Sequence, residues 1–476
     1  MKKITILAFC LSFFPLMIQA QLSGTRLVPS ANYPDMQSVV DSLNTYGSVG
    51  NGIIFQIAGG SVFQSQPLTI TASGTETAPV SIVWDGASTK PVIEFSATAA
   101  ANEAGFLFQG SDYFTLDGLK ITNPDGNLDF GIWISNQSSI NGAHHNLVKN
   151  CEITLNKLNP VQTVGVFVAP ATAATSLEGN NNYNRFHNNI LQNMTMGYSF
   201  DGSNSNTTLM SVGNEVASVD GGESIIEDLV MAGVLLDDQN GFTLSGNTIR
   251  NIVRIGTGTT APAGISTTSG NPSATLSNPY IITNNKIYYL SSSFTSIFGV
   301  YLSGRKATYH VAGNLVYGVS ASGGGGNTAD GIALIGTDII AYIYNNMVAD
   351  IAAPASAVSG NAATRGINVR TYLEAYVYHN TVFLEYDATN LSHQSAAFII
   401  YNNSDPVEMR NNVFVNKTHF PEGATGNGAA FYKRTPALTN VMPATNNNIY
   451  YAGEPSANNV IFYGHNSSAP AIDQTL

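Results

Sequence analysis

The feature that most constrains the fold is a repeated motif in which a glycine or alanine is followed by alternating apolar residues. From Gly131 onward the motif recurs every 31 to 36 residues across about 300 residues. A sustained period of this length, in strand-like segments without intervening helices, predicts a solenoid of parallel β-strands. The motif begins at Gly105, Gly131, Gly165, Gly197, Gly233, Gly264, Gly299, Gly331, Gly366, Ala397 and Ala430.

A second mark, an asparagine in a turn, follows the first by 14 or 15 residues in the most regular repeats. Coils of a solenoid stack at about 4.8 Å, so equivalent asparagines would lie above one another and form a hydrogen-bonded ladder. We therefore expect Asn346→Leu and Asn380→Leu to destabilise the protein. The marks fall at Asn150, Asn188, Asn214, Asn247, Asn285, Asn314, Asn346, Asn380, Asn412 and Asn447.

The two ends of the chain have different sequence character from the repeats. Residues 1–20 combine two lysines with an apolar run and end on a small residue, which is typical of a secretory signal peptide. Residues 21–50 are predicted to form an N-terminal cap with one short helix between Pro34 and Gly47, and residues 51–476 a β-helix of about eleven regular coils. Because the final residues show no polar cap, we expect a truncated C-terminus.

Composition and charge exclude several classes of function. The formal charge is −12, and loss of Lys2 and Lys3 with the signal peptide would make it −14. An acidic surface argues against nucleic acid as a partner. No later stretch is apolar enough to span a membrane, and Cys151 would be the only cysteine left, so no internal disulfide forms. We expect a secreted or cell-surface monomer without membrane insertion.

With these repeats the chain resembles the pectin-lyase-like superfamily of secreted bacterial proteins over roughly residues 50–465. The resemblance implies an all-β fold, a right-handed parallel β-helix, with the short helix as its N-terminal cap. It also implies interaction with an extracellular polysaccharide, by binding or by cleavage as a lyase or glycoside hydrolase. The alternative, a structural or adhesive surface module without catalysis, stays open because that superfamily contains both kinds of protein.

Charged residues after the glycine-motif strands are the candidate catalytic groups. A lyase acting on a uronic polymer would use a basic residue among Arg305, Lys306 and Arg370, with calcium held by Asp237, Asp238 and Asp338. A hydrolase would use two carboxyl groups, for which Asp338 and Glu374 are candidates. The segment "GVLLDDQNG" resembles the paired aspartates of polygalacturonase-like hydrolases, but their companion "GHG" and "RIK" patterns are absent. Solvated surface pairs are the competing interpretation.

A row of aromatic residues before the asparagine turns is the candidate carbohydrate-binding surface. Alternation places their side chains outward on neighbouring coils, where flat rings suit sugar faces. The competing expectation is that a long insertion, residues 321–330 or 352–364, folds over the rings and buries them. The row comprises His310, Tyr342, Tyr344, Tyr376 and Tyr378.

Overall fold

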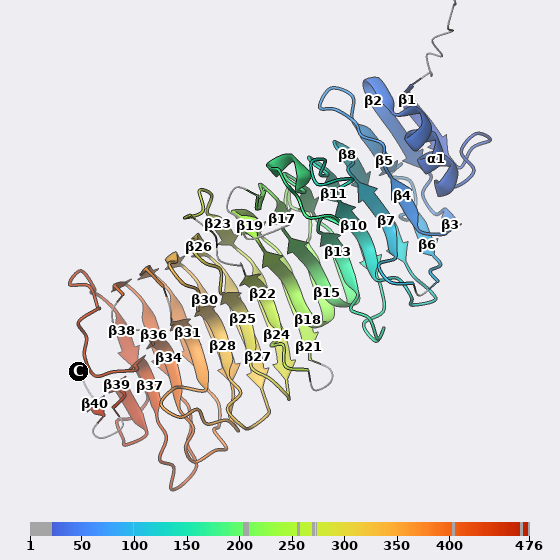
Figure 1. Ribbon diagram of the computed structural model, residues 1–476. Coiled ribbons are helices and arrows are strands. Elements are labelled where there is room, and N and C mark those ends of the chain that lie inside the picture. The colour runs from blue at the N-terminus through green and yellow to red at the C-terminus, as the bar shows by residue number, and fades with distance from the viewer. Residues whose placement is uncertain are drawn as a thin grey trace, which may run out of the picture.

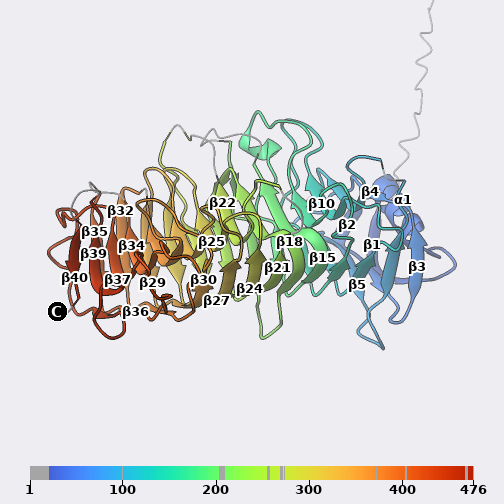
Figure 2. The same ribbon diagram turned by 90° about the horizontal axis from the view of Figure 1, so that it is seen from below.

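The computed structural model describes residues 21–474, except residues 99, 203–208, 255–257, 269–271, 273, 371, 402–404 and 467–469. The predicted signal peptide, residues 1–20, lies outside the described residues. Successive strands stack along a single axis from the N-terminus to the C-terminus (Figure 1), and the view from below shows the same elongated stack (Figure 2). Within the described residues, no helix is long and apolar enough to cross a membrane.

The first of three faces is a parallel sheet of 13 strands, each paired with the equivalent strand of the next coil. The fold is therefore a parallel β-helix, as the repeat predicts. The strands of the first face are β1 (Leu22–Val28), β2 (Ser48–Ile57), β5 (Val80–Trp84), β8 (Phe114–Asp117), β11 (Leu147–Lys149), β14 (Arg185–His187), β17 (Glu215–Ala217), β20 (Phe242–Ser245), β23 (Tyr280–Thr283), β26 (Thr308–Ala312), β29 (Ile340–Tyr344), β32 (Glu374–Tyr378) and β35 (Val407–Arg410).

The second face begins on the next side of each coil. Two of its strands, β15 and β18, are long and continue around a bend into the third face. In β15, for example, residues 190–192 pair with β12 of the second face and residues 196–200 pair with β13 of the third. The strands of the second face are β3 (Val62–Ser65), β6 (Val92–Phe95), β9 (Lys120–Thr122), β12 (Glu152–Thr154), β15 (Ile190–Asp201), β18 (Ile225–Asp237), β21 (Thr248–Val253), β24 (Lys286–Ser292), β27 (Leu315–Ala321), β30 (Met347–Ala352), β33 (Thr381–Leu384), β36 (Val413–Asn416) and β38 (Ile449–Tyr451).

The third face carries the glycine motif and shares β15 and β18 with the second. Its last strand, β40, pairs antiparallel with β39, whereas the earlier pairs are parallel. Besides β15 and β18, the third face contains β4 (Leu68–Ile70), β7 (Ala104–Gln109), β10 (Phe130–Ser135), β13 (Val164–Val168), β22 (Ala263–Thr268), β25 (Ile297–Leu302), β28 (Ala329–Leu334), β31 (Thr364–Val369), β34 (Ser395–Ile400), β37 (Gly428–Lys433), β39 (Asn459–Gly464) and β40 (Ala471–Asp473).

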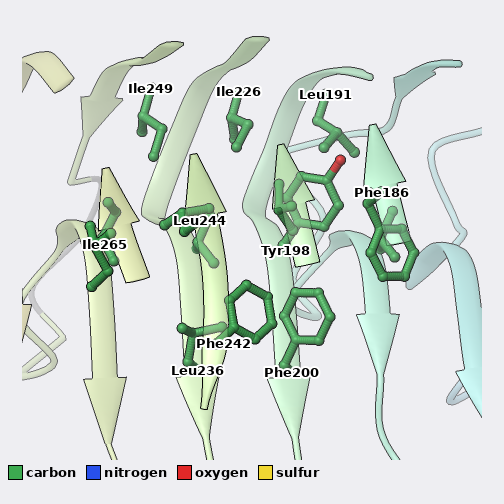
Figure 3. Packing of buried hydrophobic residues seen from close by; sticks show 14 of the residues in the cluster. Phe186, Leu191, Tyr198, Phe200, Ile226, Leu236, Phe242, Leu244, Ile249 and Ile265 are labelled. Atoms are coloured by element: carbon green, nitrogen blue, oxygen red, sulfur yellow. The ribbon is translucent and has the colours of Figure 1, made fainter. Parts of the chain in front are cut away.

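One apolar core fills the space between the three faces. Inward residues such as Phe186, Tyr198 and Leu236 are completely buried, and residues of successive coils stack on one another (Figure 3). Cys151 belongs to this core, where burial raises the pKa of its thiol to about 12. Cys151 thus serves as a small core residue.

The asparagine ladder is present, and the structure explains why asparagines come in pairs. In "NNKIYYL" Asn284 adopts a left-handed backbone conformation, with a φ of 57°, while Asn285 points inward. The side-chain amide of Asn285 donates to Oδ1 of Asn314 over 3.0 Å, and the same contact repeats along the coils. The ladder runs through Asn247, Asn285, Asn314, Asn346, Asn380, Asn412 and Asn448.

Four predicted ladder positions were wrong. Asn150, Asn188 and Asn447 are the left-handed turn residues, and the inward positions are one residue later, at Cys151, Asn189 and Asn448. The fourth, Asn214, belongs to a second ladder before the first face, together with Asn146 and Asn184. A doubled asparagine does not reveal from sequence which member turns the backbone and which points inward.

The glycine motif forms a column in which adjacent backbones meet. A Cβ atom on Gly331 would lie 2.6 Å from the carbonyl oxygen of Gly366 and 2.4 Å from a methyl group of Val348. The same close approach recurs from Gly105 to Gly366, so glycine is required there by space. Ala397 and Ala430 occupy the later, completely buried positions of the column.

Before the coils, the predicted N-terminal helix is α1 (Met36–Tyr46). Asp35 caps it by accepting a hydrogen bond from the backbone of Ser38, and Gly47 ends it with a φ of 63°. Pro34 therefore precedes the cap instead of lying in the first turn. Met36, Val39, Val40 and Leu43 form the predicted apolar stripe and are buried over the first coil. The remaining elements are η1 (Leu177–Gly179) and the short pair β16 (Ser211–Val212) and β19 (Gln239–Asn240).

Candidate functional site

The charged turns predicted to form a catalytic site lie along one edge but on different coils. Asp237 ends β18, and Arg370 follows β31, which is four strands further along the third face. At about 4.8 Å for each strand the separation is about 19 Å. Asp338 follows β28, about 14 Å from the level of Asp237. Arg370 is therefore far from Asp237 and Asp238, whereas Arg305 and Lys306 follow β25, only two strands or about 10 Å from Asp237. Catalysis by Arg305, Lys306 or Arg370 stays a prediction.

The predicted basic residues have contacts of their own. Lys306 lies in the turn after β25 beside Arg305 and donates through Nζ to the carbonyl oxygen of Pro272 over 2.8 Å. Arg370 stacks on one ring, that of Tyr401, with its guanidinium carbon 4.6 Å from the ring centroid. Arg434, on the next coil, approaches the same ring at 3.9 Å. These cation–π contacts fix Arg370 at the far end of the edge.

The two carboxylates predicted for a hydrolase also have different surroundings. Glu374 begins β32, is paired in register with Ile340, and accepts a hydrogen bond from the hydroxyl of Tyr376 over 2.8 Å. Asp338 lies in an exposed turn two residues before Ile340, with a φ of 57°. Within the described residues, no group of three or more His, Cys, Asp or Glu side chains is arranged to hold a metal ion. Metal binding by Asp237 and Asp238 therefore stays a prediction.

The predicted aromatic row lies on the outer side of the first face, and its rings stack on each other. His310 and Tyr342 lie 5.0 Å apart at 7°, and Tyr342 and Tyr376 lie 5.0 Å apart at 8°. The shared ring faces point along the solenoid axis, so the row presents edges and hydroxyl groups outward. Tyr344 and Tyr378 form the neighbouring column, and the hydroxyl of Tyr378 donates to Glu408.

The long insertions do not bury this aromatic row. All five of its residues stay half-buried. The insertion after β27 instead contacts the end of β24, since the backbone of Ser322 donates to the carbonyl oxygen of Ser292. The insertion after β30 is contacted by Thr389, which donates to the carbonyl oxygen of Pro354. The row therefore remains accessible, although stacking on its flat ring faces is available only at its ends.

A hollow lies on the outer side of the third face. The sequence does not predict it. It is a cavity of about 570 Å³ over β18, β22 and β25, within the range common for ligand pockets. Phe298 and Tyr301 form an aromatic wall, with ring centroids 4.5 Å apart. Hydroxyl and amide groups form most of the remainder, and none of the lining residues is charged. The lining comprises Leu235, Thr259, Thr260, Ala261, Ser266, Thr268, Thr295, Ser296, Phe298, Tyr301 and Asn327.

Two carboxylates lie beyond one side of this cavity, outside its lining. Thr268 lines it and pairs in register with Asp237, which in turn pairs with Asp201. Desolvation of the carboxyl group, and then repulsion from Asp237 and Asp238, raises the pKa of Asp201 to about 6. Asp201 was not among the predicted residues; the signal would have been its place one repeat before Asp237, which parallel stacking turns into direct proximity.

On the opposite side, the next coil contains a buried polar cluster. Asp330 is in register with Phe298 of the aromatic wall and forms an ion pair of 2.9 Å with Arg365. Its other carboxylate oxygen accepts a hydrogen bond of 2.8 Å from Asn368. Burial raises the pKa of Asp330, and the charge of Arg365 opposes this change. The cluster thus pairs its charges within the protein, next to the aromatic wall and outside the cavity lining.

The fold is thus that of a parallel β-helix, and comparison with known proteins agrees at that level alone. No family model matches the chain, and no curated protein sequence matches it. Among solved structures, a GH136 lacto-N-biosidase from Eubacterium ramulus is similar with a TM-score of 0.45 and 13% identity. That match covers 80% of this chain and 64% of the biosidase. The chain therefore spans less than two thirds of that protein.

Two other solved structures are similar at the same distance. A variant of the periplasmic alginate epimerase AlgG gives a TM-score of 0.46 and 11% identity, covering 86% of this chain and 84% of the epimerase. The PL6 family alginate lyase AlyGC also gives 0.46 and 11%, covering 94% of this chain and 55% of the lyase. These likenesses concern the path of the chain alone.

Proposed function

We propose that the protein is a secreted or cell-surface glycan-binding β-helix that holds a neutral sugar chain in the third-face cavity. The observation that carries this proposal is the cavity's lining, which combines the aromatic wall of Phe298 and Tyr301 with hydroxyl and amide side chains and has no charged residue among its described members. Sugar rings have apolar C–H faces and hydroxyl edges, so they match such a lining. A uronic polymer would need cationic partners that the lining lacks.

The position of the cavity also favours an extended ligand. It lies on an outer strand surface whose neighbouring coils carry the half-buried rings of Trp133 and Phe167 in the same side-chain column as Leu235 and Tyr301. A glycan chain running along the solenoid axis would therefore pass from the cavity towards further apolar side chains. The predicted aromatic row on the first face is a separate surface for the same class of ligand.

The binding proposal is tested by replacing the aromatic wall. Tyr301→Ala is expected to weaken binding of a neutral oligosaccharide by about tenfold, because a ring contact contributes about 1.4 kcal/mol or less. Tyr451→Ala, at an exposed tyrosine on the second face, is the matched control and should bind as the wild type does. Titration calorimetry against a panel of neutral and uronic oligosaccharides gives both dissociation constants. Equal affinities for the two variants, or preference for uronic chains, would contradict the proposal.

A second function, hydrolysis of the bound glycan, is supported by the in-register pairing of Asp201 with Asp237 on adjacent strands, together with the raised pKa of Asp201. The backbones of in-register neighbours on parallel strands lie about 4.8 Å apart, so the two side chains can reach the carboxyl separation of about 5–5.5 Å that retaining glycosidases use. Asp201, about half protonated at pH 6, would donate its proton to the leaving glycosidic oxygen, and Asp237 would attack the anomeric carbon. Water would then release the sugar, with Asp201 acting as the base.

This hydrolytic proposal has a simple readout in new reducing ends. Asp201→Asn is expected to lower the rate by about 10²–10⁴-fold while leaving oligosaccharide affinity unchanged. A calcium-dependent unsaturated product would instead support the lyase prediction based on Arg305, Lys306 and Arg370. If no product of either kind forms while binding persists, the protein is a binding or adhesive module, which is the alternative expected from the sequence.

A further inference from the structure

A separate column of aromatic rings lies in the turns that precede the first face. The rings of Tyr113 and His145 stack 4.7 Å apart at 13°, and those of His145 and Tyr183 stack 5.0 Å apart at 8°. The coil spacing therefore places one planar group above another at each step. On the next two coils the column continues with Gly213 and Gly241, which have no side chains.

These turn positions require a left-handed backbone. The φ values are 49°, 56° and 56° at the three aromatic residues, and 68° and 80° at the two glycines. Bulky residues adopt this conformation at an energetic cost that glycine avoids, and such strain tends to be kept where a side chain has a task. The column thus retains rings at a cost over three coils and then omits them over two.

The structure has a cavity where the rings are omitted. It measures about 310 Å³, at the lower end of ligand pockets. The ring of Tyr183, 45% exposed, forms one wall, and Asn278 and Pro279, three coils further along, form the opposite wall. The glycine backbones and Thr243 lie between them. We refer to this hollow as the ring slot.

The walls of the ring slot are held by hydrogen bonds. Val212 accepts a hydrogen bond from the backbone of Tyr183 over 2.9 Å and belongs to β16, which pairs with β19. Oδ1 of Asn240 accepts one from the backbone of Asn278 over 3.2 Å. Next to the glycine backbones, the side-chain amide of Asn214 donates to Oε1 of Gln239. Asn214 is the last member of the second ladder. The slot is therefore formed before a ligand arrives, which reduces the entropy lost on binding.

We propose that the ring slot binds one pyranose ring of a glycan, stacked against Tyr183 as the next member of the ring column. The apolar face of the sugar would lie on the tyrosine ring, and its hydroxyl groups would reach the Thr243 hydroxyl and the Asn278 amide at the rim. The Asn278 amide already donates to the carbonyl oxygen of Asn240 over 3.4 Å, but the Thr243 hydroxyl would gain no partner from a purely aromatic ligand, so the mixed lining favours a sugar. This site is independent of the third-face cavity, because it lies on another face.

The slot also opens onto the predicted aromatic row. Thr243 pairs in register with Ile281, then His310, then Tyr342, in one outward column of the first face. A glycan held in the slot would therefore extend over the edges of the stacked rings. Longer oligosaccharides are expected to bind more tightly than a single sugar.

The test uses the Tyr301→Ala variant of the full chain as background, so that binding at the third-face cavity does not obscure the slot. Methyl β-D-glucopyranoside and methyl β-D-galactopyranoside are the sugar probes, and phenol is the aromatic probe, each followed by saturation-transfer NMR. We expect transfer to at least one glycoside. Adding Tyr183→Ala is expected to weaken that binding by about tenfold.

A second variant fills the slot without removing a ring. Thr243→Tyr places a tyrosine in a column that already contains His310, Tyr342 and Tyr376, and it should abolish glycoside binding while the melting temperature is kept. Tyr46→Ala, at an exposed tyrosine in α1, is the control that should change nothing. Transfer to phenol alone, equal glycoside binding in all variants, or no transfer to any probe would overturn the proposal.

Discussion

At the scale of single residues, the two members of each asparagine pair have different structural roles. Asn345 turns the backbone with a φ of 55°, whereas Asn346 is buried and forms four side-chain hydrogen bonds. Its Oδ1 accepts from the backbone and side chain of Asn314, and its Nδ2 donates to Val311 and to Asn380. The ladder thus joins neighbouring coils at a buried bend where backbone groups need partners.

Asn346→Leu is therefore expected to lower the free energy of unfolding by about 2–3 kcal/mol, because the buried partners lose their hydrogen bonds. Chemical denaturation monitored by circular dichroism measures the change. Asn345→Gly is the matched control, since glycine keeps the left-handed backbone and no buried contact is lost. A Leu variant as stable as the wild type would show that the ladder contributes nothing.

Asp201 gives a pH-dependent prediction. Its pKa is raised to about 6 in the folded protein from an ordinary value of 3.8, so the folded state binds the extra proton between these pH values. Stability therefore falls as pH rises through this range. Asp201→Asn removes the effect, and its melting temperature should exceed that of the wild type at pH 7.5 and approach it at pH 4.

Asp350→Asn is the control for the loss of one surface charge, because Asp350 is an exposed residue on β30 in the same left-handed conformation that asparagine tolerates. A stability difference between Asp201→Asn and the wild type that stays constant from pH 4 to 7.5 would contradict the raised pKa. Differential scanning calorimetry across this pH range provides the measurement.

The predictions for single residues were correct where they follow from strand alternation and wrong where they depend on which residue adopts a positive φ. The inward positions beside the ladder, such as Ile343 and Val348, follow from alternation and are buried as expected. The ladder register failed by one residue at Asn150, Asn188 and Asn447, since the sequence does not show which residue adopts a positive φ. Asp201 was missed because its environment depends on a neighbour 36 positions away in the sequence.

At the scale of elements, the glycine column sets how closely the strands of the third face approach the second. Gly331→Ala would place a methyl group 2.6 Å from the carbonyl oxygen of Gly366, which forces the backbone to shift. We expect a loss of about 1–3 kcal/mol in the free energy of unfolding. Ala397→Gly, at a later position where alanine is native, is the control and should cost about 1 kcal/mol or less. Equal effects would contradict a steric role for the column.

The elements could be predicted where the period is regular and not where loops vary. The glycine motif predicts strands such as β25, β28 and β31, and alternation predicts the outward tyrosines of β29 and β32. The third-face cavity is formed partly by loop residues, including Thr259, Thr295 and Asn327, which carry no periodic signal. Its aromatic wall lies on a predicted strand, but the hollow above that wall depends on where the loops turn.

At the scale of the whole molecule, a solenoid converts sequence distance into distance along an axis. Residues one repeat apart become neighbours, as Asp201 and Asp237 do, whereas those several repeats apart separate steadily, as Asp237 and Arg370 do. A sequence that places charges at equivalent repeat positions thus predicts an edge and not a cluster. The proposed sites follow this rule, because each one draws on two to four adjacent coils.

A crystal structure of the protein soaked with the neutral oligosaccharide that binds most tightly in the panel would show whether the third-face cavity holds a glycan. We expect a sugar ring against Phe298 and Tyr301, with hydroxyl groups within hydrogen-bond distance of Ser266, Thr268 or Asn327. An oligosaccharide that leaves this cavity empty while occupying another surface, or a panel in which no neutral chain binds, would contradict this expectation.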